Sequence, residues 1–255
     1  MSPQVTDLTQ TLLPGIPADQ VYARLAQGDG NELDGKILSP ESSAALAVNA
    51  FGWFLQRPHL FPGFPGIVSA QAAPILVDLE RKVRFPWPGG RHPNLDAWVE
   101  YSSILIGIES KRFEPFRDRK KPHFSSAYDR PVWGSQMAPF EQMRDHLRGH
   151  PGCYRHLDAA QLVKTAFGLV TQSRRDSRPA ALVYLFAEPD SLHGRPIPAA
   201  DKATHRKEIA HFAAAVSQGA VAFHAIGYRE WLDTWPASPP DLAGHRTALL
   251  RRYSL

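Results

Sequence analysis

The sequence predicts an α/β protein with a mixed central β-sheet flanked by helices, and three observations support this. Residues 94–101 and 104–111 alternate in character and are rich in β-branched and aromatic side chains, as strands are. Residues 180–186 are continuously apolar, as expected of a strand covered on both faces. Residues 157–172 carry apolar side chains with the spacing of an amphipathic helix.

The remaining elements follow in chain order. Ser39, Pro40 and Glu41 form a typical helix start, with an N-cap serine, a proline at the first helical position and an early acid. In the strand that follows, Val77, Leu79, Val83 and Phe85 are expected to share one face. The expected elements are a helix from 39 to 55, a strand at 75–85, a hairpin at 94–111, helices at 139–147 and 157–172, a strand at 180–186, a helix at 202–216, a strand at 221–228 and a helix at 241–253.

Length and composition indicate an ordinary globular protein. With 255 residues, 43% hydrophobic and 21% charged, we expect a single domain over 1–255, with residues 1–38 as an N-terminal decoration. Cys153 is the single cysteine, which excludes an internal disulfide and indicates a reducing compartment. The sequence has no apolar segment of membrane-spanning length and no signal-like start, so we expect a cytoplasmic protein without a membrane partner.

The central hairpin brings charged residues together. If Ser102 and Ser103 form a two-residue turn, Trp98 pairs with Gly107 and Asp96 with Glu109. Because side chains alternate along a strand, Glu109 and Lys111 point the same way. Two carboxylates opposite one another repel. A divalent cation such as Mg²⁺ would offset that repulsion better than a lysine alone, whereas the simpler alternative is a solvated ion pair at the edge of the sheet.

At these residues the sequence resembles the PD-(D/E)XK nuclease superfamily, which has the restriction-endonuclease-like fold. The family pattern is an acid near the start of one strand and E-x-K on the next, and Asp96 and Glu109-Ser110-Lys111 match it in type, order and spacing. Residues 107–115 are similar to bacterial members of uncharacterised role, in which Glu114 recurs after the triplet. The short proline-aspartate form is absent, because Pro93 lies three residues before Asp96. The resemblance implies an αβββαβ core.

The resemblance also implies a function and a set of site residues. Asp96 and Glu109, with the Ser110 carbonyl, would hold Mg²⁺ or Mn²⁺, and Lys111 would position or deprotonate the attacking water and stabilise the phosphate. The reaction would be endonuclease-type hydrolysis of phosphodiester bonds in DNA, with RNA as the other substrate class. A homodimer is plausible, because cutting both strands often requires two sites.

Further residues are candidates with simpler alternatives. In the superfamily a helix after the hairpin often aims a glutamine and a lysine at the site, and Gln161 and Lys164 match that placement, although an amphipathic helix would expose them anyway. Glu41 could be the acid of the first core helix, or serve only the helix dipole. Glu80 could reach the metal from the neighbouring strand, or simply face solvent.

A basic, aromatic-rich segment follows the hairpin. Cations interleaved with aromatic rings suit phosphate contacts and base stacking, and a solvated loop is the alternative. The proposed nucleic-acid contacts in this segment are Arg117, Arg119, Lys120 and Lys121. The net charge of +4 is compatible with a nucleic-acid partner without requiring one. A noncatalytic nucleic-acid-binding protein of the same fold is the alternative function.

Overall fold

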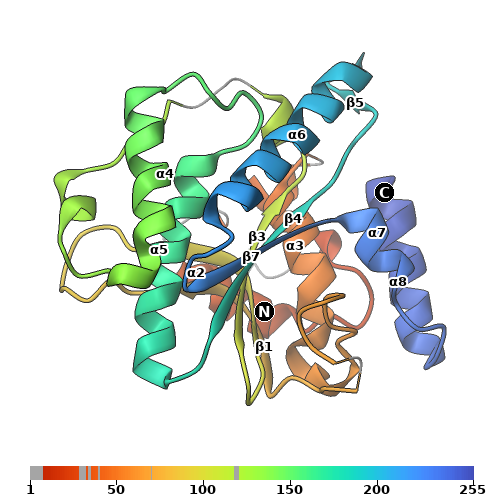
Figure 1. Cartoon of the computed structure of the whole chain (residues 1–255). Coiled ribbons are helices and arrows are strands. Elements are labelled where there is room, and N and C mark those ends of the chain that lie inside the picture. Colours follow the sequence, from red (N-terminus) through yellow and green to blue (C-terminus); the bar gives the residue numbers. More distant parts are fainter. Residues whose placement is uncertain (1–7, 29–32, 34–35, 40, 70, 118–120) are drawn as a thin grey trace.

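The computed structural model describes residues 8–28, 33, 36–39, 41–69, 71–117 and 121–255. Five strands form one sheet in the order β1-β2-β3-β4-β7 (Figure 1). Strand β2 pairs antiparallel with both β1 and β3, and β3, β4 and β7 run parallel. The strands are β1 Leu76–Lys82, β2 Asn94–Glu100, β3 Leu105–Lys111, β4 Ala180–Phe186 and β7 Val221–Gly227. The sheet is mixed, which confirms the predicted fold class.

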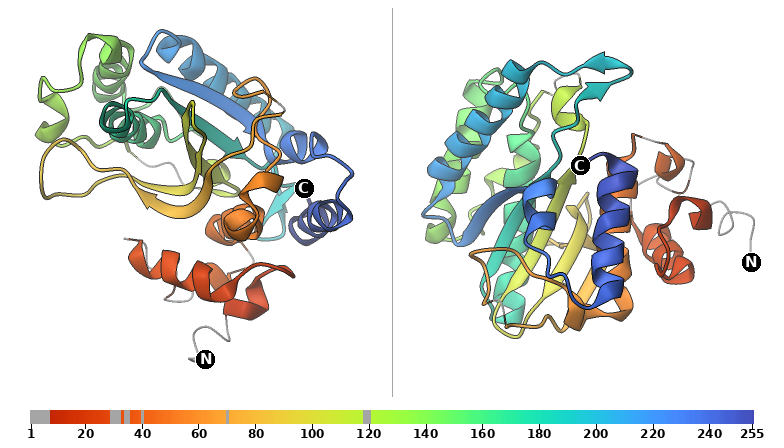
Figure 2. Two further views of the ribbon diagram at one scale, coloured as in Figure 1. Left: turned by 90° about the horizontal axis from the view of Figure 1, so that it is seen from below. Right: turned by 90° about the vertical axis from the view of Figure 1, so that its right-hand side faces the viewer.

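Helices cover both faces of the sheet (Figure 2). One layer consists of α2 Ala18–Gln27, α3 Ser43–Phe51, α7 Tyr228–Asp233 and α8 Pro240–Tyr253, and the other of α4 Ala138–Gly149, α5 Ala159–Asp176 and α6 Ala199–Val216. Short 3-10 turns occur at Lys36–Leu38, Gly52–Gln56, Pro58–Leu60, Glu114–Phe116, Ser126–Asp129 and Ser135–Met137, and a small hairpin pairs β5 Ser191–Leu192 with β6 Arg195–Pro196. Each layer encloses its own apolar cluster: Leu46, Phe51 and Trp231 belong to the first, and Leu162, Phe167 and Phe212 to the second.

The order of α3, β1, β2, β3, α5 and β4 confirms the expected αβββαβ core, with α4 as an addition. The hairpin register is also confirmed, because Trp98 pairs with Gly107 and the Tyr101 N–H donates to the Ile104 carbonyl at 2.9 Å. Strand β4 has the predicted bounds and is buried along its whole length. No helix within the described residues combines the length and the apolar character that a membrane crossing requires.

The start of one helix was predicted wrongly, and two short elements were not predicted. The first core helix begins later than expected, because Ser42 rather than Ser39 is its N-cap and accepts the Ala45 N–H at 3.1 Å. Ser39 instead accepts the Glu41 N–H at 3.3 Å in a local turn, and Pro40 lies outside the described residues. The helix α7 and the β5–β6 hairpin were not predicted, because elements of six and two residues carry too little periodicity to be recognised.

The apolar side chains in and just after β1 do not all lie on one face of the sheet. Leu79 and its partner Ala97 belong to the first cluster, whereas Val83 and Leu95 belong to the second. The β1–β2 pairing skips one residue on each strand, and the β1 residue, Glu80, has a φ of +50°. Both strands therefore exchange faces at the level of Glu80 and Asp96, so the prediction that Val83 shares a face with Leu79 was wrong.

Gly107 allows β3 to pack closely under its neighbours. A Cβ atom at this position would lie 2.8 Å from Leu95 Cδ1 and 2.9 Å from Leu169 Cδ2, and both leucines are fully buried. We expect Gly107→Ala to lower the free energy of unfolding by about 1–3 kcal/mol, because overpacking forces buried side chains from their rotamers. Urea denaturation measures this change.

Gly244→Ala in α8 is the matched control. A Cβ there meets no atom within 4 Å, so the substitution should be neutral or stabilise the helix. Equal unfolding free energies for Gly107→Ala and the unsubstituted protein would contradict the close packing described for β3.

Candidate active site

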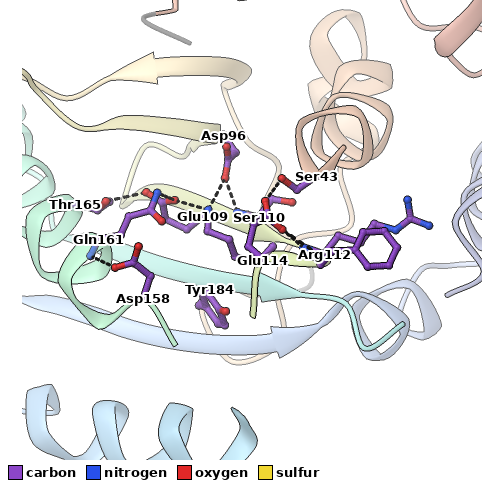
Figure 3. Close-up of polar contacts among 12 residues, drawn as sticks. Ser43, Asp96, Glu109, Ser110, Arg112, Glu114, Asp158, Gln161, Thr165 and Tyr184 are labelled. Atoms are coloured by element: carbon purple, nitrogen blue, oxygen red, sulfur yellow. Dashed lines mark hydrogen bonds and ion pairs between the residues drawn. The ribbon is translucent and has the colours of Figure 1, made fainter. Parts of the chain in front are cut away.

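Three charged side chains converge at the open end of the hairpin (Figure 3). Lys111 Nζ lies 3.2 Å from Glu109 Oε2 and 3.6 Å from Asp96 Oδ2. The side chain of Glu109 is 1% exposed, that of Lys111 13% and that of Asp96 25%. The carboxylates are thus largely removed from water and share one ammonium group.

Asp96 is placed by the divergence of β2 from β3. The Cα pairing of these strands runs only as far as Ala97 and Ile108, so the Asp96–Glu109 pair expected from the sequence lies just beyond the ladder. The Asp96 side chain fills this gap, because its Oδ2 accepts the Ser110 N–H at 2.7 Å. The Ser110 hydroxyl is on the other side of the sheet, 2.6 Å from the Tyr228 hydroxyl. Only the Ser110 backbone therefore belongs to the site.

Helix α5 holds Glu109 from above the sheet. Gln161 Nε2 donates to Glu109 Oε2, and Thr165 Oγ1 donates to Glu109 Oε1, both at 2.8 Å. The helix starts at this point because Asp158 is its N-cap and accepts the Gln161 N–H at 2.9 Å. The cap fixes the first turn of α5, and Gln161 and Thr165 follow on one face at i and i+4.

Burial is the largest influence on the pKa values of the two carboxyl groups. Burial raises the pKa of Glu109 to about 7, although Lys111 and the bond from Thr165 favour the ionised form. The pKa of Asp96 is also raised by burial, with Lys111 and the Ser110 N–H opposing that shift. Burial would lower the pKa of Lys111, but Asp96 and Glu109 outweigh it and hold that pKa well above its usual value. Lys111 is therefore protonated.

Glu114 is a third carboxylate near Lys111. Its Oε2 accepts the N–H groups of Arg112 at 3.0 Å and Phe113 at 3.1 Å, and its Oε1 accepts the Ser43 hydroxyl of α3. Burial opposes ionisation of Glu114, but Lys111 and these hydrogen bonds prevail and lower its pKa. Glu114 is thus a half-buried, ionised group that fastens the end of β3 to α3.

Two other predicted acids lie elsewhere. Glu41 precedes α3, and its carboxylate forms an ion pair of 3.0 Å with Arg117 and lies 3.0 Å from His193 Nδ1. Glu80 accepts a hydrogen bond from Asn94 and lines a separate basic hollow at the β1 edge that also includes Arg24. The structure brings neither residue to Lys111.

The predicted basic residues do not all lie at this site either. Lys164 Nζ lies 5.3 Å from the centre of the Phe124 ring. Arg117 lines a cavity next to Lys111, and Lys121 is exposed. Arg119 and Lys120 lie outside the described residues.

The sequence interpretation missed several residues at this site. Thr165 could have been found, because it lies four residues after Gln161 on the same helical face. Asp158 could have been found as a residue that caps a helix beginning at Ala159. Tyr184, which pairs in register with Glu109 and lines the same cavity as Lys111, has no signal in an entirely apolar strand.

The described residues contain no group of three or more His, Cys, Asp or Glu side chains arranged to hold a metal ion. The groups that could hold an ion at this site are the two carboxylates Asp96 and Glu109 and the backbone carbonyl of Ser110. Two carboxylates are the usual protein contribution to a Mg²⁺ site, where water and substrate phosphate complete the coordination.

A mixed αβββαβ sheet with two acids and a lysine on adjoining strands defines a protein of the restriction-endonuclease-like class. The family model described as "Restriction Endonuclease associating with ARP" matches residues 13–254, and this chain belongs to that family. No curated protein and no solved structure matches it. The family description indicates a nuclease-like function with DNA as its partner.

The raised pKa of Glu109 predicts how stability depends on pH in the absence of divalent cations. A carboxyl group with a folded pKa of about 7 and an unfolded value of 4.5 favours folding when protonated, and that contribution is lost as pH rises from 4.5 through 7. We expect the unsubstituted protein to lose stability relative to Glu109→Gln between pH 5 and 8, by up to about 3 kcal/mol. Urea denaturation with a chelator present measures the difference.

Glu114→Gln is the control for this measurement. Because the pKa of Glu114 is lowered, this group stays ionised across the same pH range. Its substitution should cost a nearly constant free energy of unfolding from pH 5 to 8. A pH-independent difference between Glu109→Gln and the unsubstituted protein would contradict the electrostatics of the site.

Proposed function

We propose that this chain is a metal-dependent nuclease of the PD-(D/E)XK type that hydrolyses phosphodiester bonds in DNA. The observation that carries the proposal is the convergence of Asp96, Glu109 and Lys111 beside an open cavity. A single lysine between two acids at the end of a sheet provides the charges that a phosphate and a dication require.

The charge balance supports a dication at this site. Asp96, Glu109 and Glu114 all interact with Lys111, so three carboxylates face one ammonium group. Burial raises the pKa of Asp96 and Glu109 because this positive charge is insufficient. Asp96, Glu109 and the Ser110 carbonyl would hold Mg²⁺ or Mn²⁺. The chemistry such an ion supplies when bound is Lewis-acid activation of the phosphoryl group and a lower pKa for the attacking water.

The protein's own residues have separate roles in this proposal. Lys111, kept protonated by its neighbours, would bind a non-bridging phosphate oxygen and stabilise the negative charge that develops there. Gln161 and Thr165 would hold the Glu109 carboxylate in one orientation through their two hydrogen bonds. Asp158 would act one step further away, by fixing the helical turn that carries Gln161.

Nucleic acid would reach the site across a basic rim. Arg117 lines the cavity beside Lys111, and the exposed Lys121 follows in the same segment. Contacts of this kind bind phosphates without reading sequence, so affinity should fall as salt concentration rises. A second copy of the chain would supply the second active site needed to cut both strands of a duplex.

Asp96→Asn and Lys111→Met should each reduce cleavage of plasmid DNA in Mg²⁺ or Mn²⁺ by at least about 100-fold, because the first removes a carboxylate that would hold the metal and the second removes the positive charge that would bind the phosphate. Gel electrophoresis of the plasmid measures cleavage, and circular dichroism checks that the fold persists. Asparagine keeps an oxygen that can accept the Ser110 N–H, so the strand ends should remain in place.

Lys207→Met is the matched control, since this exposed lysine lies on α6, away from the residues that line the cavity. It should cut as the unsubstituted protein does. Full cleavage by Asp96→Asn or Lys111→Met would refute the assignment. Salt-sensitive DNA binding without metal-dependent cleavage in the unsubstituted protein would favour a noncatalytic DNA-binding role.

A further inference from the structure

A basic hollow of about 420 Å³ lies at the edge of the sheet, beside β1. Strand β1 is the first in the sheet order and pairs only with β2. Helix α2 of one helical layer and α5 of the other also line this hollow, which we call the β1 hollow. Its walls therefore come from three elements that are far apart in the sequence. Its cationic side chains are Arg24, Arg81, Lys82, Arg84 and Arg175.

Positive charge is in excess in the β1 hollow. Its two carboxylates, Asp78 and Glu80, are outnumbered by the five cations. The Asp78 side chain is 8% exposed and forms an ion pair with Arg24, and Arg81 Nη1 lies 3.8 Å from its Oδ2. Glu80 accepts a hydrogen bond from Asn94. An anionic ligand would reduce the repulsion among the remaining cations.

Two of these cations have no carboxylate partner among the described residues. Arg84 and Arg175 are both exposed. Arg175 Nη2 donates to the Phe85 carbonyl at 3.1 Å, and the Arg84 side chain makes no hydrogen bond or ion pair within the described part of the chain. Both guanidinium groups therefore keep donors that can bind a phosphate, whose geometry a guanidinium matches with paired hydrogen bonds.

Protection of the sheet edge does not account for all of this charge. Edge strands often carry cationic residues and bulges that prevent pairing with another chain. Arg81 and Lys82 fit that explanation, because they follow Glu80 on β1, and Glu80 has a φ of +50°. Arg24 and Arg175 lie on helices rather than on the strand, so edge protection does not explain them. Cations arranged around a concave surface favour an anionic ligand instead.

The β1 hollow lies at the same end of the sheet as the candidate active site. Lys82 pairs with Asn94, two residues before Asp96. Helix α5 links the two places, because Gln161 lines the cavity at the active site and Gln172 lines the β1 hollow. These glutamines are eleven residues apart on α5, which is about 16 Å along a helix axis. Duplex DNA spans that distance in about five base pairs.

We propose that the β1 hollow binds the phosphate backbone of the DNA substrate, about five base pairs from the phosphate held at Lys111. This inference rests on the proposed nuclease function for the place of the scissile phosphate. Arg84 and Arg175 bind the backbone directly, whereas Arg24 and Arg81 contribute mainly charge because Asp78 interacts with them. Contacts of this kind hold a duplex in position without reading its sequence.

Arg84→Gln combined with Arg175→Gln tests the β1 hollow without leaving a buried carboxylate unpaired. Fluorescence anisotropy would measure the binding of a labelled DNA duplex of about 20 base pairs, with a chelator present so that nothing is cleaved. We expect this double variant to bind about tenfold more weakly at physiological salt. The slope of log Kd against log salt concentration should fall by about two, because each lost phosphate contact lowers it by about 0.9.

Lys207→Gln combined with Arg251→Gln is the matched control, because these exposed cations lie on α6 and α8 and do not line the hollow. This variant loses the same net charge and should bind DNA as the unsubstituted protein does. An equal loss in both double variants, no loss in either, or no DNA binding by the unsubstituted protein would overturn the proposal. DNA binding that depends on the hollow, without cleavage in Mg²⁺, would refute the nuclease function alone.

A cross-link would locate the DNA directly. Gln27→Cys places a thiol for a photoreactive label in the β1 hollow, in a background with Cys153→Ser. Gln218→Cys is the control, since Gln218 is exposed and precedes β7, whose start aligns through β4 with the start of β3, at the opposite end of that strand from Lys111. We expect DNA to cross-link at Gln27→Cys at least about fivefold more than at Gln218→Cys. Similar yields at the two positions would contradict DNA binding in the hollow.

Discussion

The site depends on one constraint, which is that Asp96 and Glu109 lie close together at the end of a sheet with a single ammonium between them. Burial makes the ionised pair costly, and Lys111 offsets only part of that cost. Other polar contacts serve the same balance. The Ser110 N–H supports Asp96, and α5 supports Glu109 from the opposite side. The two carboxylates therefore have too little positive charge beside them, and the proposed dication would supply what is missing.

Helix α5 links the two carboxylates to the rest of the fold. Its apolar face is buried in the second cluster, where Val163, Ala166 and Phe167 fix its position over the sheet. Its polar face then delivers Gln161 and Thr165 to Glu109. The same first turn, capped by Asp158, forms one wall of the cavity beside Lys111. The packing of one helix thus positions both the proposed catalytic carboxylate and one wall of this cavity.

Much of this architecture could be predicted from local sequence. The hairpin register follows from its short turn, and strand β4 from its continuous apolar run. Gln161 was placed by resemblance, and it does contact Glu109. The position of Glu80 could not be predicted, because its left-handed backbone conformation depends on how β1 and β2 pair. Tyr184 was also missed. Its hydroxyl contacts His205 on α6, which comes later in the chain, so the local sequence of β4 does not reveal this contact.

The exchange of faces at Glu80 and Asp96 determines what holds Asp96 in position. Asp96 sits where β1 and β2 turn over, and its carboxylate reaches along the sheet to the backbone of β3 rather than into either helical layer. Because this contact is with a backbone N–H, it does not depend on a particular side chain of either helical layer. The position of Asp96 depends instead on the register between β1 and β2. A one-residue deletion in β1 would therefore displace Asp96 more than many substitutions among the surrounding helices.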